Sequence, residues 1–260
     1  MSQRVAESGV SADYGTIVVV GGGCYGSYYV KQLGRANKAG AITWERLLVV
    51  DRNPDCLVAI NGLLDQSDGS STAPTMITAE WSDFFRDYLG QWPADPAARQ
   101  TDSIVPSPLM PHLLYEWVRD RASERWPHRS VETVPLDGKP DTPWESAAPD
   151  GTQYVSFATW TCPINCIEPD ICPHTRSERT WTMPKAMEDY VAAESREGRA
   201  IDGPLVFHCT HRAFGVGMIP VPAVVDADLV VTRTAAERAS RFVIATVSHC
   251  HGAINILSVG

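Results

Sequence analysis

The sequence lacks several features that would narrow its function at once. It has no apolar run near the roughly 20 residues needed to cross a bilayer, and its first residues do not follow the basic, apolar and small-residue order of an export signal. Positive charge is scarce, because 22 Lys and Arg against 31 Asp and Glu give a net charge of −9, which disfavours binding to a phosphate backbone. We therefore expect a cytoplasmic protein that binds neither nucleic acid nor membrane.

The sequence also contains no phosphate-binding G-K-[ST] motif and no catalytic-triad signature. Its composition, with 44% hydrophobic and 20% charged residues, is that of an ordinary globular protein. A chain of 260 residues buries about 70% of its unfolded surface, so no metal is needed merely to hold the fold together.

Apolar and amphipathic segments alternate along the chain, which predicts strands and helices in alternation. The expected strands are Thr16–Val20, Leu47–Val50, Thr75–Ala79, Tyr154–Trp160, Leu205–Cys209 and Ala253–Val259, and Ser103–Val105 is a short apolar segment. The expected helices are Cys24–Leu33, Pro54–Leu64, Trp81–Leu89, Leu109–Ala122 and Lys185–Arg196. Two further apolar segments, Val224–Val231 and Arg241–Ser248, flank a helix-like stretch.

This alternation predicts an α/β, Rossmann-like fold with a mostly parallel sheet, helices on both faces and a cysteine-rich C-terminal portion. Residues 1–150 are expected to form a nucleotide-binding domain. Residues 151–260 are expected to form a metal-binding portion that continues the same α/β fold.

A glycine-rich turn opens the first predicted helix. Gly21, Gly23 and Gly26 fit the pattern G-x-G-x-x-G, in which the first glycine permits a tight turn, the second lets a pyrophosphate approach the backbone and the third lets helix and strand pack closely. Asp51 ends the next predicted strand, 25 residues after Gly26, where an acid accepts hydrogen bonds from a ribose. These four residues are the predicted cofactor-binding residues.

Over about residues Thr16–Ser107 the sequence resembles the NAD(P)-binding Rossmann superfamily. Asp51 favours NAD, whereas the adjacent Arg52 is suited to the 2′-phosphate of NADP. FAD or a methyl donor also fits such a turn, and a turn that holds no dinucleotide stays an open alternative. Tyr25, inside the turn, is expected to pack at the helix start rather than to act in catalysis.

Seven cysteines in a chain without an export signal indicate metal ligands, catalysis or buried thiols rather than disulfides. Cys162, Cys166 and Cys172 lie within eleven residues that prolines keep irregular. Thiolates on such loops hold iron–sulfur clusters, and a proline directly after a ligand recurs in bacterial ferredoxins, although this spacing matches neither ferredoxin pattern. We predict a 4Fe–4S cluster closed by Cys209 or Cys250, or left with one open iron that binds substrate as a Lewis acid.

Zinc is the competing metal, with His174 as a fourth ligand, but structural zinc loops space their ligands more closely than the five-residue gap here. Thiols that bind nothing, or that form a redox pair, are the third reading of the cysteine segment.

Histidines follow two of the apolar segments. His208 and His211 come at and after the end of one, and His249 and His251 follow the other. Because ligands bind outside the carboxyl ends of strands in open α/β sheets, we expect these segments to converge with the cysteine loop. The four histidines are the candidate catalytic acids or bases, or additional metal ligands, and the alternative is that they are hydrogen-bonded structural residues.

Together these features predict an oxidoreductase that combines a dinucleotide, NAD(P) or FAD, with an iron–sulfur cluster, and that acts on a small-molecule substrate with an electron-transfer partner. NAD(P)H delivers a two-electron hydride whereas a cluster moves single electrons, so direct exchange needs a flavin between them. Two alternatives stay open: a non-enzymatic nucleotide-binding protein with a structural or redox-sensing metal site, and an iron–sulfur lyase.

Overall fold

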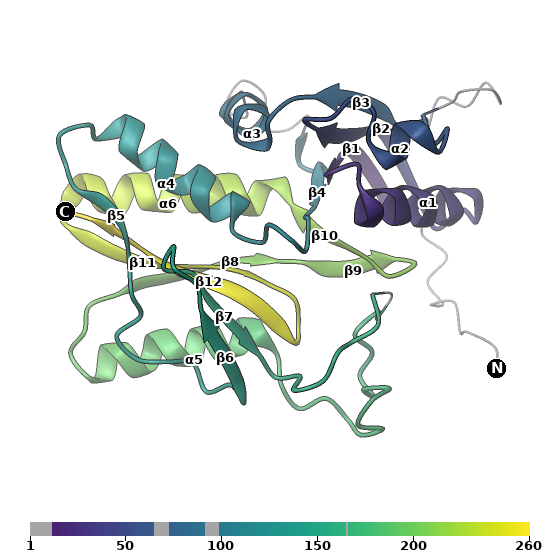
Figure 1. Ribbon diagram of the computed structural model, residues 1–260. Helices are drawn as coiled ribbons and strands as arrows, with labels where there is room; N and C mark the ends of the chain where they lie inside the picture. Colours follow the sequence, from purple (N-terminus) through teal and green to yellow (C-terminus); the bar gives the residue numbers. More distant parts are fainter. Residues whose placement is uncertain (1–11, 65–72, 92–98, 165) are drawn as a thin grey trace.

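The computed structural model describes residues 12–64, 73–91, 99–164 and 166–260. Within these ranges the chain is an α/β fold in which two mixed sheets and several helices are layered on one another (Figure 1). None of the helices in this part of the chain is long and apolar enough to span a bilayer.

The first sheet has the strand order β3-β2-β1-β4-β10-β9. Its strands are β1 (Ala12–Val20), β2 (Ile42–Asp51), β3 (Thr75–Thr78), β4 (Ser103–Val105), β9 (Thr210–Ala213) and β10 (Val216–Pro220). Strands β1 to β4 pair in parallel, and β10 and β9 are added antiparallel beyond β4.

Helices cover both faces of the first sheet, which is why its central strand β1 is apolar on both sides. Ile17 and Val19 pack in the core beneath α1 (Cys24–Lys38) and α2 (Leu57–Ile60). Val18 and Val20 point the other way, into a second core. That core includes α3 (Trp81–Gly90), α4 (Leu113–Arg125) and α6 (Val221–Glu237).

The second sheet has the order β6-β7-β12-β11-β8, with β5 also paired to β12. Its strands are β5 (Val131–Val134), β6 (Trp144–Ala147), β7 (Gln153–Ser156), β8 (Asp202–His208), β11 (Ser240–Val247) and β12 (His251–Val259). All of its pairs are antiparallel except β8 with β11. Helix α5 (Met183–Arg196) covers one face, and α4 and α6 lie against the other, between the two sheets (Figure 1).

The predicted α/β class is confirmed, but a mostly parallel sheet describes only β1 to β4. Val224–Val231 lies inside α6, and its sequence shows no helical pattern because Leu229 and Val230 are apolar although they lie on the exposed face. The predicted helix Pro54–Leu64 shrinks to the four residues of α2, and the predicted helix at Leu109 begins only at Leu113. β9 and β10 were not predicted, because a short run containing Gly217 and Pro220 carries little strand signal.

Both halves of the chain contribute to both sheets. β5 and β6 precede residue 150 and lie in the second sheet, whereas β9 and β10 follow it and complete the first. The two sheets therefore do not divide at residue 150. That residues 1–150 bind a nucleotide and residues 151–260 a metal stays a prediction.

One extended segment passes from the second sheet into the first. β8 pairs with β11 as far as His208, and β9 pairs with β10 from Thr210 onward. Between them the Cys209 N–H donates to the carbonyl oxygen of Val247 at 2.7 Å. This crossing places the carboxyl end of β8 next to both sheets.

The turn between β1 and α1 depends on glycine at two positions. Gly21 has a φ of +85°, which L side chains rarely adopt. A Cβ on Gly26 would lie 1.8 Å from the carbonyl oxygen of Gly21, so the first turn of α1 approaches the end of β1 too closely for any side chain.

We expect Gly26→Ala to lower the free energy of unfolding by about 2 kcal/mol, because the backbone must move apart to admit the methyl group. The matched control is Gly34→Ala in the same helix, where an added Cβ meets nothing within 4 Å. That change should raise stability by about 0.5 kcal/mol. Denaturant unfolding of both variants measures the difference, and equal midpoints would contradict the close packing of this turn.

Candidate functional site

Three segments meet at one edge of the second sheet. Because β8 and β11 are parallel, His208 and the turn after Val247 lie at the same end, and the His208 and His249 rings meet edge to face with centroids 4.8 Å apart. Ser156 at the end of β7 pairs with His251 at the start of β12, so the cysteine loop also begins at this edge. The sequence segments that were expected to converge do lie together.

The cysteine loop is irregular but tied down by main-chain hydrogen bonds. The Cys172 N–H donates to the carbonyl oxygen of Ser177 at 2.9 Å, and the Arg176 N–H donates back to that of Cys172 at 2.8 Å. Arg179 donates from its guanidinium to the carbonyl oxygen of Glu168 and from its main chain to that of Asp170. The prolines therefore prevent a regular strand or helix, and the hydrogen bonds fix the conformation of the loop.

Glu168 connects this loop to the two strand ends. Its side chain is 5% exposed, and its Oε2 lies 3.3 Å from His211 Nδ1 and 3.2 Å from His249 Nδ1. The His249 N–H also donates to this oxygen at 3.1 Å. Burial by itself would raise the pKa of Glu168, but hydrogen bonds from His211, the Ser248 hydroxyl and the His249 main chain outweigh it and hold the pKa well below its usual range. The residue is therefore an ionised, buried carboxylate.

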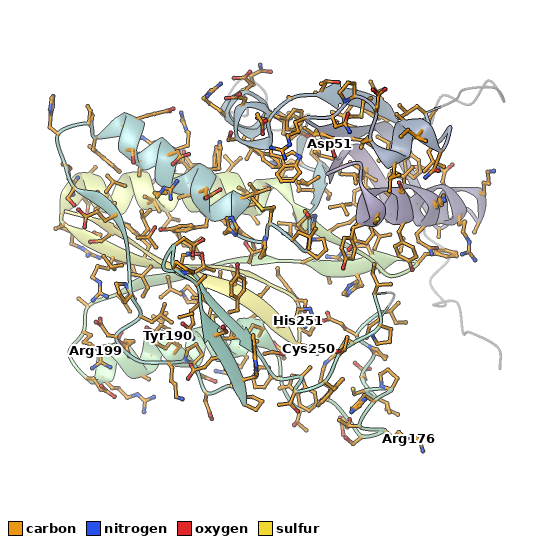
Figure 2. All side chains as sticks on the ribbon, in the orientation of Figure 1. Asp51, Arg176, Tyr190, Arg199, Cys250 and His251 are labelled. Atoms are coloured by element: carbon orange, nitrogen blue, oxygen red, sulfur yellow. The ribbon has the colours of Figure 1, made fainter. Side chains whose placement is uncertain are left out.

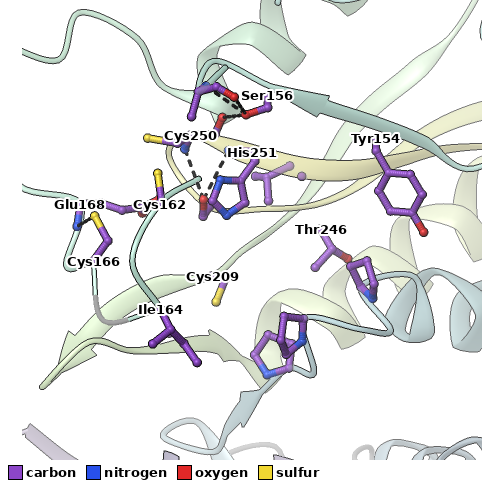
Figure 3. A pocket seen from close by; sticks show the side chains of 18 of the residues that line it. Tyr154, Ser156, Cys162, Ile164, Cys166, Glu168, Cys209, Thr246, Cys250 and His251 are labelled. Carbon is purple, nitrogen blue, oxygen red and sulfur yellow. Dashed lines mark hydrogen bonds between the residues drawn. The ribbon is translucent and has the colours of Figure 1, made fainter. Parts of the chain in front are cut away.

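Four cysteines line a single cavity of about 230 Å³: Cys162, Cys166 and Cys172 from the loop, and Cys250 from the β11–β12 turn. Figure 3 shows Cys162, Cys166 and Cys250 near Glu168, with Cys209 apart from them. Among the described residues no group of three or more His, Cys, Asp or Glu side chains is arranged to hold a metal ion. The four thiols surround a space and do not converge on one point.

The thiols differ in their pKa. Burial raises the pKa of Cys162 and of Cys250, and the neighbouring Cys166 adds to the effect at Cys162. The pKa of Cys172 is lowered instead, chiefly because the Thr175 main-chain N–H donates to its sulfur. Cys209 is different again, since burial raises its pKa to about 12. The predicted ligand Cys209 is thus a buried thiol at the β8–β9 crossing.

A second, larger cavity of about 750 Å³ joins the cysteine loop to the first sheet. One part of its wall comes from the segments that follow β1 and β4, including Tyr25, Tyr29 and Ser107. Another part comes from the cysteine loop and the β11–β12 turn, including Cys162 and His251. Ligands in α/β sheets commonly bind where neighbouring parallel strands lead to helices on opposite faces, and this cavity lies at that position between β1 and β4.

The glycine-rich turn leaves room beside the helix start. A Cβ on Gly23 would meet nothing within 4 Å, and no side chain caps the N-terminus of α1. Asp51 is engaged locally, because its carboxylate accepts the N–H groups of Gly22 at 2.7 Å and Asn53 at 2.9 Å. It lies on the first sheet, well away from Cys250 and His251 (Figure 2).

The predicted site residues fall into separate positions. His211 and His251 line the larger cavity, whereas His208 and His249 do not. Burial lowers the pKa of both His208 and His251, which keeps these two imidazoles neutral near pH 7. Sequence reasoning missed Glu168, which has no spacing pattern of its own.

We expect Glu168→Ala to lower the free energy of unfolding by about 1–3 kcal/mol, because it leaves two half-buried imidazoles and a main-chain N–H without their acceptor. Glu178→Ala is the control, since Glu178 is an exposed acid ten residues further along the same loop. Thermal unfolding of both variants compares them. A Tm for Glu168→Ala equal to that of Glu178→Ala would show that the carboxylate does not hold the loop.

Comparison with known proteins gives one family. Residues 114–260, from the start of α4 to the end of the chain, match the family AF_1314_C, described as an uncharacterized protein, C-terminal domain. No curated protein and no solved structure matches the chain. The matched residues include the cysteine loop, Glu168 and all four histidines of the site, but not the glycine-rich turn. The chain belongs to this family, whose match covers more than half of it.

Proposed function

We propose that this chain is a redox protein that binds a nucleotide at the glycine-rich turn and an iron–sulfur cluster at Cys162, Cys166, Cys172 and Cys250. One observation carries the proposal: the larger cavity is lined both by the segments after β1 and β4 and by the cysteine loop. A ligand bound there would contact Tyr25 and Tyr29 of α1, next to the glycine-rich turn, on one side and a thiolate centre on the other.

The thiol arrangement supports a cluster more than a single ion. Zinc in a structural site needs four ligand atoms within about 2.1–2.3 Å of one point, and the described residues do not provide such a group. A cluster is a body of several atoms whose thiolates are spread around it, as the four thiols are spread around their cavity. Cys250 supplies the fourth thiol, so every iron of a 4Fe–4S cluster would have a cysteine ligand. A closed site favours electron transfer over lyase chemistry.

The first sheet supports the nucleotide. The parallel order β3-β2-β1-β4, with helices on both faces, is that of one half of a Rossmann fold. Gly21 and Gly26 occupy their tight-turn and close-packing positions, and Gly23 has open space beside it. The uncapped N-terminus of α1 offers N–H donors to a pyrophosphate.

A cluster supplies single electrons when bound, and a flavin nucleotide is the dinucleotide that exchanges both single electrons and hydride. The chain's own residues would position these groups. Glu168 fixes the loop that carries three of the thiols, and Tyr25 and Tyr29 line the cavity on the side of α1.

The cluster is tested by iron and acid-labile sulfide analysis, with a visible spectrum, on protein purified without oxygen. The intact chain should be brown, and Cys162→Ala and Cys250→Ala should each lose most of the iron. Cys209→Ala is the matched control, because Cys209 does not line the four-cysteine cavity. It should keep its iron.

Colourless, iron-free protein overturns the cluster. Stoichiometric zinc in its place would indicate a structural metal site. If Cys209→Ala loses its iron and Cys250→Ala keeps it, the fourth ligand is Cys209 and not Cys250.

The nucleotide is tested with Gly23→Ala. The residue has an extended backbone, with φ −75° and ψ −152°, and free space around it, so the variant should unfold like the parent chain. The added methyl group stands where a pyrophosphate would approach, and we expect affinity for FAD or NADH to fall at least tenfold, about 1.4 kcal/mol. Gly34→Ala is the control and should bind as the parent does. Titration by fluorescence measures both, and unchanged binding in Gly23→Ala places the nucleotide elsewhere.

A further inference from the structure

The wall of the larger cavity has a one-sided charge. Among the described residues that line it there is no lysine and no arginine, and the only acid is Glu168. The remaining polar groups are neutral hydroxyls, thiols and the two imidazoles of His211 and His251. An anion entering this space would lose part of its hydration without gaining a cationic partner.

Aromatic side chains stand on three sides of the same cavity. Tyr25 and Tyr29 come from α1, with ring centroids 6.4 Å apart and planes tilted by 30°. Tyr154 comes from β7 and Trp144 from β6. Trp160 comes from the segment before Cys162 and is held by stacking on His174 at 4.4 Å, outside the cavity wall. Figure 3 shows Tyr154 and Glu168 on opposite sides of the space.

This combination selects for ligand shape and charge. Flat aromatic faces pack against flat rings, and their negative faces attract cations but not anions. The buried carboxylate adds to the attraction for a positive group or an N–H donor. Phosphate groups of a nucleotide would remain at the start of α1, whose glycines lie outside the lining of this cavity.

We propose that the substrate of this chain is a planar ring compound that is uncharged or positively charged, and that carboxylates and phosphate esters are excluded from the cavity. The inference rests on the proposed function only in taking this cavity as the place where the substrate meets the thiolate centre. It requires neither the cluster nor the nucleotide for ligand binding itself.

Three probes of nearly equal shape test which ligand charge the cavity prefers. Benzamidine is a cation with N–H donors, benzamide is neutral and benzoate is an anion. Binding is measured calorimetrically to the full chain at pH 8, above the ordinary imidazole pKa of about 6.5. We expect benzamidine to bind more tightly than benzamide, and benzoate to bind at least tenfold more weakly than benzamidine.

Two variants locate the binding in the cavity. Tyr25→Leu removes an aromatic wall and should weaken benzamidine about threefold, while Tyr28→Leu, on the same helix but outside the lining, should not. In Glu168→Gln the affinity for benzamidine should fall towards that for benzamide. The affinity for benzoate should stay below both.

Benzoate binding as tightly as benzamidine, equal binding of all three probes, or no binding by any of them would overturn the proposal. Because probe binding is read without turnover, it fails or succeeds independently of iron content and of FAD or NADH affinity. If Cys162→Ala loses its iron but still binds benzamidine more tightly than benzamide and benzoate, the proposed charge preference of the cavity is supported and the cluster is not needed for it.

Discussion

The passage of one extended segment from the second sheet into the first is the constraint on which the site depends. β8 must end beside β11, and β9 must begin beside β10, so the chain crosses between the sheets at Cys209. The crossing brings His208 to the β11–β12 turn and His211 to the cavity beneath α1. The core that both sheets share around α4 and α6 adds a second connection between them.

Glu168 completes this arrangement from the loop side. It is the one described residue of the loop whose carboxylate lies within 3.3 Å of imidazoles from two other segments, His211 of β9 and His249 of the β11–β12 turn. A residue with positive φ in a buried position is costly, and Glu168 has φ +50°. The hydrogen bonds that its carboxylate and its own main chain receive offset that cost and fix the loop.

Local signals made the first sheet largely predictable. The apolar run before Gly21 and the spacing of the three glycines specify a strand, a tight turn and a closely packed helix, and each step depends on neighbours in the sequence. The second sheet was harder to predict from the sequence. Strand β12 pairs with β5 and β7, which lie roughly 100 or more residues away, such as Tyr154 with Ala253, and no local pattern reveals that these strands will be neighbours. Most of helix α6 was missed because its exposed face carries Leu229 and Val230, so Val224–Val231 lacks the polar stripe that marks a helix.

The candidate site shows the same limit. The cysteine spacing and the histidines at strand ends could be recognised in the sequence. Glu168 could not, because only the fold brings its carboxylate to the imidazoles. Tyr25 was expected to pack at the helix start, yet it lines the larger cavity. The fourth thiol was undecided between Cys209 and Cys250, since both follow apolar strands, and only tertiary structure places Cys250 with the loop.

The sulfurs of the cysteine loop have main-chain donors and one arginine as neighbours. Main-chain N–H groups serve as donors to the sulfurs: Glu168 donates to Cys166 Sγ at 3.4 Å, and Thr175 and His174 donate to Cys172. Arg179 faces the smaller cavity, where it contributes to lowering the pKa of Cys172. Among the described residues, Arg179 lines the smaller cavity, whereas no lysine or arginine lines the larger one. Aromatic rings line the larger cavity instead, and in our proposal these rings set which ligands can enter.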